Sequence, residues 1–139
     1  MPYKIRRSHE CHIGHRVYGH ESKCANLHGH GYVFNFTCES VNLDAIGRIV
    51  DFSVIKSRLC QWLEDNWDHR LLLWESDPWL EGLRAIDKGV VAVPFNPTAE
   101  KMAEYLVEVV APRELEGLGV AVTSCRVEET RKCAASYCR

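Results

Sequence analysis

The sequence lacks any long hydrophobic run, which argues against a protein that spans a membrane. A membrane-spanning helix needs about 20 consecutive apolar residues, and no stretch of this chain approaches that length. The first residues are basic, but no apolar segment follows them as it would in a secretory signal. We therefore expect a soluble, cytoplasmic protein with no membrane partner.

An excess of positive charge is also missing. The chain has 17 Lys and Arg residues against 19 Asp and Glu residues, a net charge of −2. Proteins that bind nucleic acid generally carry a surplus of Lys and Arg that neutralises phosphates. A local basic patch stays open, but the composition predicts no nucleic-acid partner.

The seven cysteines include no Cys-x-x-Cys pair, and their number is odd. Both features argue against a disulfide framework and for free thiols or metal ligands in a reducing compartment. The chain has no internal repeat and no flexible linker. Its 139 residues, 46% of them hydrophobic, suit a single domain over residues 1–139.

Alternating and helical hydrophobic patterns predict an α+β domain. We expect four strands in one antiparallel sheet and two helices on one of its faces. The strands are expected at 3–17, 31–38, 89–95 and from 117–119 through Val127, with a short extended piece at 49–50 and a C-terminal tail; the helices are expected at 52–67 and 99–111. Asp51 and Thr98 are suited to cap the two helices. Such a sheet leaves edges uncovered, which favours self-association.

Histidine is concentrated in one segment, with six of the seven between His9 and His30. His28 and His30 are two residues apart at the start of a predicted strand, so their rings point to the same side. One earlier histidine would complete three neutral nitrogen ligands, the pattern of a catalytic zinc with an open fourth position. The residues alone equally allow a hydrogen-bonded histidine pair, with Cys24 as a zinc ligand or a buried thiol.

Seven short motifs together resemble one enzyme family. They are His15, Cys24, His28-Gly-His30, Gly47-Arg-Ile-Val-Asp51-Phe52, Asp68-His69, Pro97-Thr98-Ala-Glu100 and Glu129-Thr130. In this order they resemble the 6-pyruvoyl-tetrahydropterin synthase family. The three residues between Cys24 and His28 are similar to the bacterial branch, the 6-carboxy-tetrahydropterin synthases of queuosine and 7-deazaguanine synthesis. The resemblance extends from about residue 10 to the C-terminus.

The resemblance implies that His15, His28 and His30 hold Zn²⁺. His12 and His20 are alternatives to His15 as a ligand. It further implies that Cys24 is a proton-abstracting base and that Asp68 and His69 complete the proton transfer. Lys23 and the zinc would lower the pKa of the Cys24 thiol. From the residues alone, His69 could equally be a histidine stabilised at a helix end.

The substrate would be held by a carboxylate. In the family resemblance, Glu129 accepts the two parallel N–H donors of a pterin ring, and Glu128 would point the opposite way if the strand persists. Thr98 is a second pterin contact. Four basic residues are candidates to meet a triphosphate, although such residues are usually only solvated: Arg16, Lys23, Arg131 and Lys132.

The implied reaction is the zinc-dependent conversion of 7,8-dihydroneopterin triphosphate to 6-carboxy-5,6,7,8-tetrahydropterin, with release of acetaldehyde and triphosphate. Two alternatives are a 6-pyruvoyl-tetrahydropterin synthase, which leaves the carbon–carbon bond intact, and a catalytically silent zinc- or pterin-binding protein.

The family's tunnelling fold implies a homohexamer of two stacked trimers with shared active sites. The chain departs from the family at Cys11-His12-Ile13-Gly14, where Phe-x-Ala-Ala is usual, and after Asp68-His69.

Overall fold

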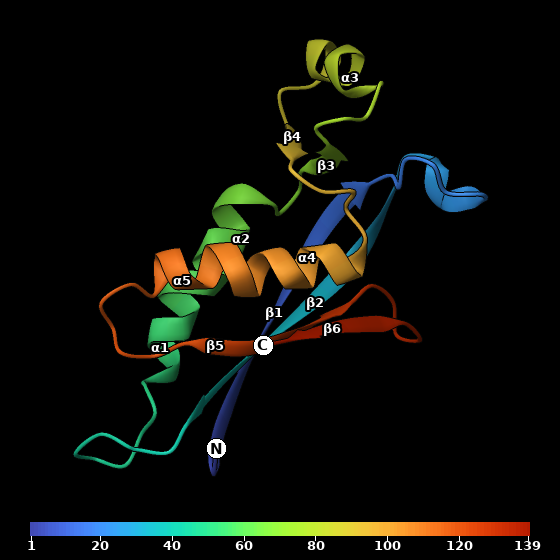
Figure 1. Cartoon of the computed structure of the whole chain (residues 1–139). Coiled ribbons are helices and arrows are strands. Elements are labelled where there is room, and N and C mark those ends of the chain that lie inside the picture. Colours follow the sequence, from blue (N-terminus) through green and yellow to red (C-terminus); the bar gives the residue numbers. More distant parts are fainter.

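Two long paired strands form the centre of the computed structural model, which describes residues 1–139 (Figure 1). Strands β1 (Tyr3–His15) and β2 (His28–Ser40) are antiparallel over their whole length, from the pair Tyr3 and Ser40 to the pair His15 and His28. Side chains alternate across a strand, and the alternate positions of both strands are buried on one face. That face carries the hydrophobic core, and the other is polar.

The sheet has six strands in the order β4-β3-β1-β2-β5-β6. Strands β5 (Val122–Glu128) and β6 (Ala134–Cys138) continue it in antiparallel fashion beside β2. Strands β3 (Leu71–Trp74) and β4 (Val90–Val93) lie on the other side, where the β1–β3 and β3–β4 pairs are parallel. The α+β class is confirmed, but the prediction of four antiparallel strands is wrong.

The two additional strands escaped prediction for physical reasons. Strand β3 reads Leu-Leu-Leu-Trp, and a strand covered on both faces shows no polar alternation. Leu72 belongs to the main core, whereas Leu73 packs in a second small cluster with Leu80 and Val90. Strand β6 is short and half exposed at the sheet edge, so its residues resemble a terminal tail.

Two helical segments cross the apolar face of the sheet (Figure 1). The first comprises α1 (Phe52–Ile55), a π-helical turn (Lys56–Cys60) and α2 (Gln61–Asn66); the second comprises α4 (Ala99–Tyr105), a π-helical turn (Leu106–Val110) and α5 (Ala111–Glu114). Both predicted helices are confirmed. The Asp51 carboxylate accepts a hydrogen bond from the Ser53 amide, and the Thr98 hydroxyl accepts one from the Lys101 amide, so both caps are confirmed as well.

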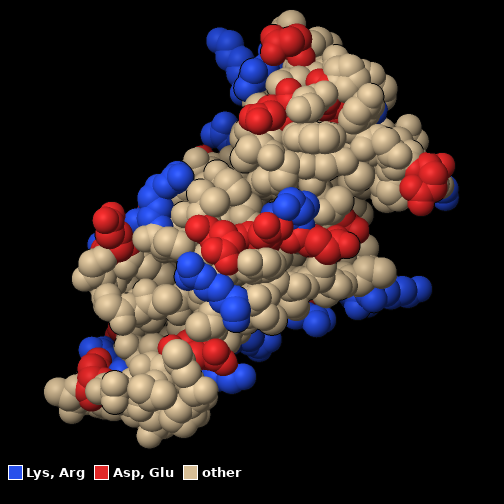
Figure 2. All heavy atoms as spheres, in the orientation of Figure 1, with Lys and Arg blue, Asp and Glu red and all other residues tan.

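A third helix, α3 (Leu80–Ile86), lies between β3 and β4 at the far end of the sheet and was not predicted. No helix of the structure is long and apolar enough to cross a membrane. On the helix-bearing face, basic and acidic side chains are interspersed (Figure 2). This face therefore presents no continuous basic surface.

Candidate metal centre and active site

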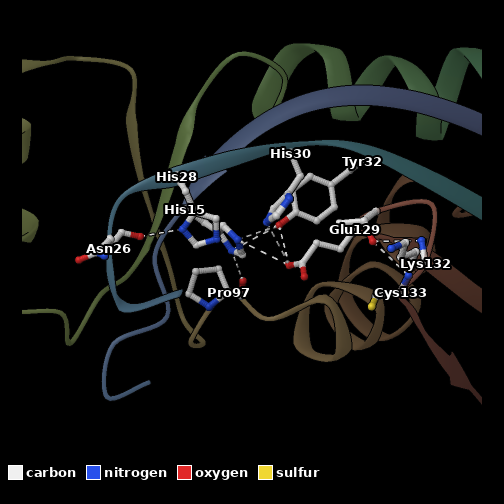
Figure 3. A network of polar contacts seen from close by, with 10 residues as sticks. His15, Asn26, His28, His30, Tyr32, Pro97, Glu129, Lys132 and Cys133 are labelled. Carbon is white, nitrogen blue, oxygen red and sulfur yellow. Dashed lines mark hydrogen bonds and ion pairs between the residues drawn. The ribbon is translucent and has the colours of Figure 1, made fainter. Parts of the chain in front are cut away.

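Three histidines converge where β1 ends and β2 begins (Figure 3). His15 is the last residue of β1, and it pairs in register with His28, the first residue of β2. His30 follows two positions later on the same face. One ring nitrogen from each of the three lies within 4.8 Å of the other two. We call these residues the histidine cluster; the strand register selects His15 as its third member.

Backbone carbonyls fix the tautomers of two of these rings. His15 Nδ1 donates to the carbonyl oxygen of Pro97, and His28 Nδ1 donates to that of Asn26, both at 2.7 Å. Since a carbonyl can only accept, the proton sits on Nδ1 and the lone pair on Nε2. Carbonyl partners of this kind orient the histidine ligands of metal sites.

Two ring nitrogens of the histidine cluster are buried and have no hydrogen-bond partner. His28 Nε2 and His30 Nε2 are the buried side-chain polar atoms that have no hydrogen-bond partner. Burial lowers the pKa of His15 to about 4 against an opposing hydrogen bond to Pro97, and it also lowers the pKa of His30. The rings of His15 and His30 are therefore neutral at neutral pH. Three imidazoles that converge with two unpaired Nε2 atoms fit a divalent ion such as zinc.

Glu129 and Tyr32 lie beside the histidine cluster. Glu129 Oε1 is 3.6 Å from His15 Nε2 and 3.7 Å from His30 Nε2. The Tyr32 hydroxyl donates to Glu129 Oε1 at 3.3 Å and lies 3.1 Å from His15 Nε2. Burial and the Glu129 carboxylate raise the pKa of Tyr32, so its hydroxyl keeps its proton. Tyr32 was missed from the sequence, although it is two residues beyond His30 on the same strand face.

Glu128 points to the other face of the sheet, as the alternation predicted. Its carboxylate accepts a hydrogen bond from Asn35 Nδ2 at 2.8 Å. Asn35 belongs to the open face of β2, away from the helices, because it is an odd number of residues from His28 and His30. The two adjacent glutamates thus serve different surfaces, and only Glu129 reaches the histidine cluster.

Cys24 sits in a short 3₁₀ turn, Lys23–Ala25, between the two long strands. The turn is held at both sides: the Val17 amide donates to the Cys24 carbonyl at 2.8 Å, and Arg16 Nη1 donates to the Ala25 carbonyl at 3.1 Å. The Cys24 thiol is one of the groups that raise the pKa of Tyr32. Cys24 thus lies in the loop that joins His15, at the end of β1, to His28, at the start of β2.

Arg16 is not available to a triphosphate. Its guanidinium is buried, donates to both carboxylate oxygens of Asp77, and lies 3.5 Å from the centre of the Trp79 ring. Asp77 and Trp79 were not singled out in the sequence because no local pattern links them to a residue 61 positions away. Three of the four basic candidates remain: Lys23, Arg131 and Lys132.

Asp68 and His69 form a hydrogen-bonded pair that contacts His12 and not the histidine cluster. Asp68 Oδ2 is 2.7 Å from His69 Nδ1, while Asp68 Oδ1 accepts from the His12 amide and the His69 amide donates to the His12 carbonyl. Burial opposes the shift, but these hydrogen bonds lower the pKa of Asp68. The His69 side chain is 74% exposed, and its backbone has a φ of 58°.

The rival ligands are placed elsewhere. His12 is three residues from His15 on the same strand, so its side chain is on the opposite face, and its ring centre is 5.7 Å from that of His69. His20 accepts a hydrogen bond from the Ser22 amide on Nδ1. Thr98 follows Pro97, whose carbonyl orients His15, but its own hydroxyl caps α4.

Comparison with known proteins gives one consistent family. The sequence model of the 6-pyruvoyl tetrahydropterin synthase family matches residues 4–139. The chain is 36% identical over 132 residues to the 6-carboxy-5,6,7,8-tetrahydropterin synthase of Rickettsia bellii and 33% identical to that of Rickettsia typhi; each match covers 94% of this chain and 96% of the relative.

Solved structures share the fold. An uncharacterised protein of Wolinella succinogenes aligns with a TM-score of 0.86 at 23% identity, covering 99% of this chain and 98% of that one. The 6-pyruvoyl tetrahydropterin synthase of Caenorhabditis elegans aligns with a TM-score of 0.72 at 20% identity, covering 99% and 95%. At these identities the likeness establishes the architecture alone.

Proposed function

The chain belongs to the 6-pyruvoyl tetrahydropterin synthase family, and from this premise we propose that it is a 6-carboxy-5,6,7,8-tetrahydropterin synthase. It converts 7,8-dihydroneopterin triphosphate and water to 6-carboxy-5,6,7,8-tetrahydropterin, acetaldehyde and triphosphate. The observation that carries the proposal is the histidine cluster with its orphaned Nε2 atoms, next to Glu129, in a chain whose relatives bear that name.

His15, His28 and His30 hold the Zn²⁺ ion. At this position the ion supplies Lewis acidity toward the hydroxyls of the substrate side chain. The chain contributes the orientation, because the carbonyls of Pro97 and Asn26 hold two rings with Nε2 directed inward. Glu129 lies next to the Nε2 atoms of His15 and His30, and we place the substrate there.

Glu129 binds the pterin ring. A pterin presents an amino group and a ring N–H side by side, and a carboxylate accepts from both donors at once. The Tyr32 hydroxyl already donates to Glu129 Oε1 and holds the carboxylate beside the histidine cluster. Thr98, adjacent to Pro97, provides a second polar contact at the ring.

Cys24 removes a proton from the substrate side chain, and Asp68 and His69 return and relay protons during the internal redox rearrangement and carbon–carbon cleavage. The His69 side chain is exposed, and the pair contacts His12, whose side chain is on the strand face opposite to that of His15. We therefore place the complete site between copies of the chain, in a homohexamer of two trimers, where His69 of one copy meets Cys24 of another. The uncovered edges of β4 and β6 suit such assembly.

The product serves queuosine or another 7-deazaguanine pathway, and the setting is the cytoplasm. All seven cysteines are free, three of them exposed or half-buried, which suits a reducing compartment. The main alternative is a 6-pyruvoyl-tetrahydropterin synthase, favoured by the structural likeness to the Caenorhabditis elegans protein. A silent pterin-binding protein would have no use for the free Cys24 and the Asp68–His69 pair.

Mass spectrometry of the products tests the proposal. Zinc-loaded protein mixed with 7,8-dihydroneopterin triphosphate should yield carboxy-tetrahydropterin and acetaldehyde. A pyruvoyl product of unbroken side chain would replace the proposal with the alternative enzyme. Unchanged substrate in the presence of folded, zinc-loaded hexamer would reduce the chain to a binding protein.

A further inference from the structure

A second group of metal-ligating side chains lies between β1 and α2. His9, Cys11 and Glu64 each offer one ligand atom, and these atoms all lie within 4.8 Å of one another. We call them the His-Cys-Glu cluster. It shares no residue with the histidine cluster, and no step proposed above uses it.

The local structure explains why the three side chains meet. His9 and Cys11 are two residues apart on β1, so both point to the helix-bearing face. Glu64 lies in α2, which packs on that face. His9 Nε2 and Glu64 Oε1 are already 2.6 Å apart in a hydrogen bond. One side of the group is dry and the other is open: Cys11 is fully buried, whereas the side chains of His9 and Glu64 are 21% and 40% exposed.

The cluster does not have the properties of a nucleophilic Cys-His-Glu triad. A nucleophilic cysteine needs a thiolate and access for a substrate. Cys11 is inaccessible, and burial with the charges of Asp68 and Glu64 raises the pKa of its thiol to about 12. The three ligand atoms instead bring nitrogen, sulfur and oxygen within 4.8 Å of one another.

We propose that His9, Cys11 and Glu64 form a second site for a zinc-class divalent cation. Thiolate and imidazole together exclude calcium and magnesium, which prefer oxygen ligands, and favour Zn²⁺ or its substitute Co²⁺. The ion takes the place of the proton shared by His9 and Glu64, and Cys11 binds as the thiolate, releasing its proton to solvent. Solvent fills the open position at the exposed side.

Such an ion would join β1 to α2, the helix that precedes Asp68 and His69. Glu64 is four residues before Asp68, and Asp68 is itself anchored on β1 through the His12 amide. The ion therefore adds a side-chain link to a contact that the backbone already makes. Its predicted role is to stabilise the position of α2 against β1.

Cobalt absorption separates the two sites. A thiolate ligand gives Co²⁺ an intense sulfur-to-metal band, which three histidines do not produce. The experiment uses the full chain with His28→Ala and His30→Ala, plus Cys24→Ala to remove the other thiol near that centre, and adds CoCl₂ under reducing conditions. We expect a sulfur-to-cobalt band at one ion per chain, and its loss when Cys11→Ala is added. Cys38→Ala, which removes another fully buried cysteine of the core, should retain the band.

A surface variant covers the case in which Cys11→Ala fails to fold. Glu64→Gln should weaken Co²⁺ binding by at least about tenfold, whereas the neighbouring Asp65→Asn should leave it unchanged, because Asp65 accepts from Gln61 instead. No sulfur-to-cobalt band in the starting variant, or equal affinity of Glu64→Gln and Asp65→Asn, would overturn the second site. These results do not depend on turnover, so the proposed enzyme function stands or falls separately.

Discussion

Arg16 and Asp77 form a bidentate ion pair that anchors the turn carrying Cys24. Arg16 Nε and Nη2 donate to the two carboxylate oxygens at 2.7 and 2.8 Å, and the residues are 5% and 4% exposed. The third guanidinium nitrogen, Nη1, donates to the carbonyl of Ala25, next to Cys24. An ion pair between the residue that follows β1 and the segment before α3 thus holds the turn that carries the proposed base.

Asp77→Asn should destabilise the protein and reduce turnover. Removing one partner of a buried ion pair leaves an uncompensated charge, so we expect a loss of about 3 kcal/mol in the free energy of unfolding, measured by urea titration. The turnover of the folded variant should fall as well, because the hydrogen bond from Arg16 to the Ala25 carbonyl loosens. Glu81→Gln breaks an exposed pair with Arg84 and should cost less than about 1 kcal/mol. Equal losses in the two variants would contradict a special role of Arg16.

The same ion pair should make the free energy of unfolding depend on pH under acidic conditions. Burial alone would raise the pKa of Asp77, but hydrogen bonds from Arg16 and the Trp79 amide and the Arg16 charge hold it below its usual value of 3.8. The stabilisation is therefore complete above pH 3.8 and is lost as the pH falls through the folded-state pKa. The stability difference between wild type and Asp77→Asn should shrink below pH 3.8; a difference constant down to pH 2 would contradict the assignment.

The histidine cluster could be predicted from the sequence to a large extent. The two-residue spacing of His28 and His30 placed both rings on one strand face, and the family motif indicated His15. The structure adds the reason, since the register of β1 and β2 sets His15 directly opposite His28. Register is a pairing between distant segments, so spacing alone could not choose among the earlier histidines.

The placement of Asp68 and His69 was beyond the sequence. The motif identified the two residues, but it gave no sign that their loop is hydrogen-bonded to the backbone of His12 on β1. The parallel strand β3 causes this arrangement, because it begins at Leu71 beside Gly14. A four-residue strand with no alternation gives no local signal of its partner.

His30→Ala should abolish binding of the first zinc ion. Its Nε2 is buried without another partner, and two nitrogens do not complete a zinc site. Metal analysis after dialysis should show one ion fewer per chain than wild type, with loss of turnover. His20→Ala is the matched control, because His20 contacts only its own loop. Unchanged metal content in His30→Ala would contradict the assignment of the histidine cluster as the zinc site.

Glu129→Gln should weaken substrate binding far more than Glu128→Gln. An amide offers one acceptor where the pterin needs two, and a hydrogen bond to a charged group contributes about 1.5–3 kcal/mol. We expect KM to rise at least about tenfold with metal content unchanged. Glu128→Gln alters only the contact with Asn35 on the open face, so its KM should match wild type. A similar KM in both variants would contradict the proposed contact between Glu129 and the pterin ring.

Mixed oligomers test whether Cys24 and His69 of different copies form one site. Cys24→Ala and His69→Ala should each be inactive, because each removes one proton-transfer group from every site. When the two variants are co-expressed and purified as hexamers, some sites combine an intact Cys24 from one copy with an intact His69 from another, and activity should return. Cys24→Ala mixed with His30→Ala provides the control, since Cys24 lies in the loop between β1 and β2 of the same chain that holds His30, so every site keeps one inactivating defect. If the first mixture stays as inactive as the control, the exposed Asp68–His69 pair has no part in a site between copies.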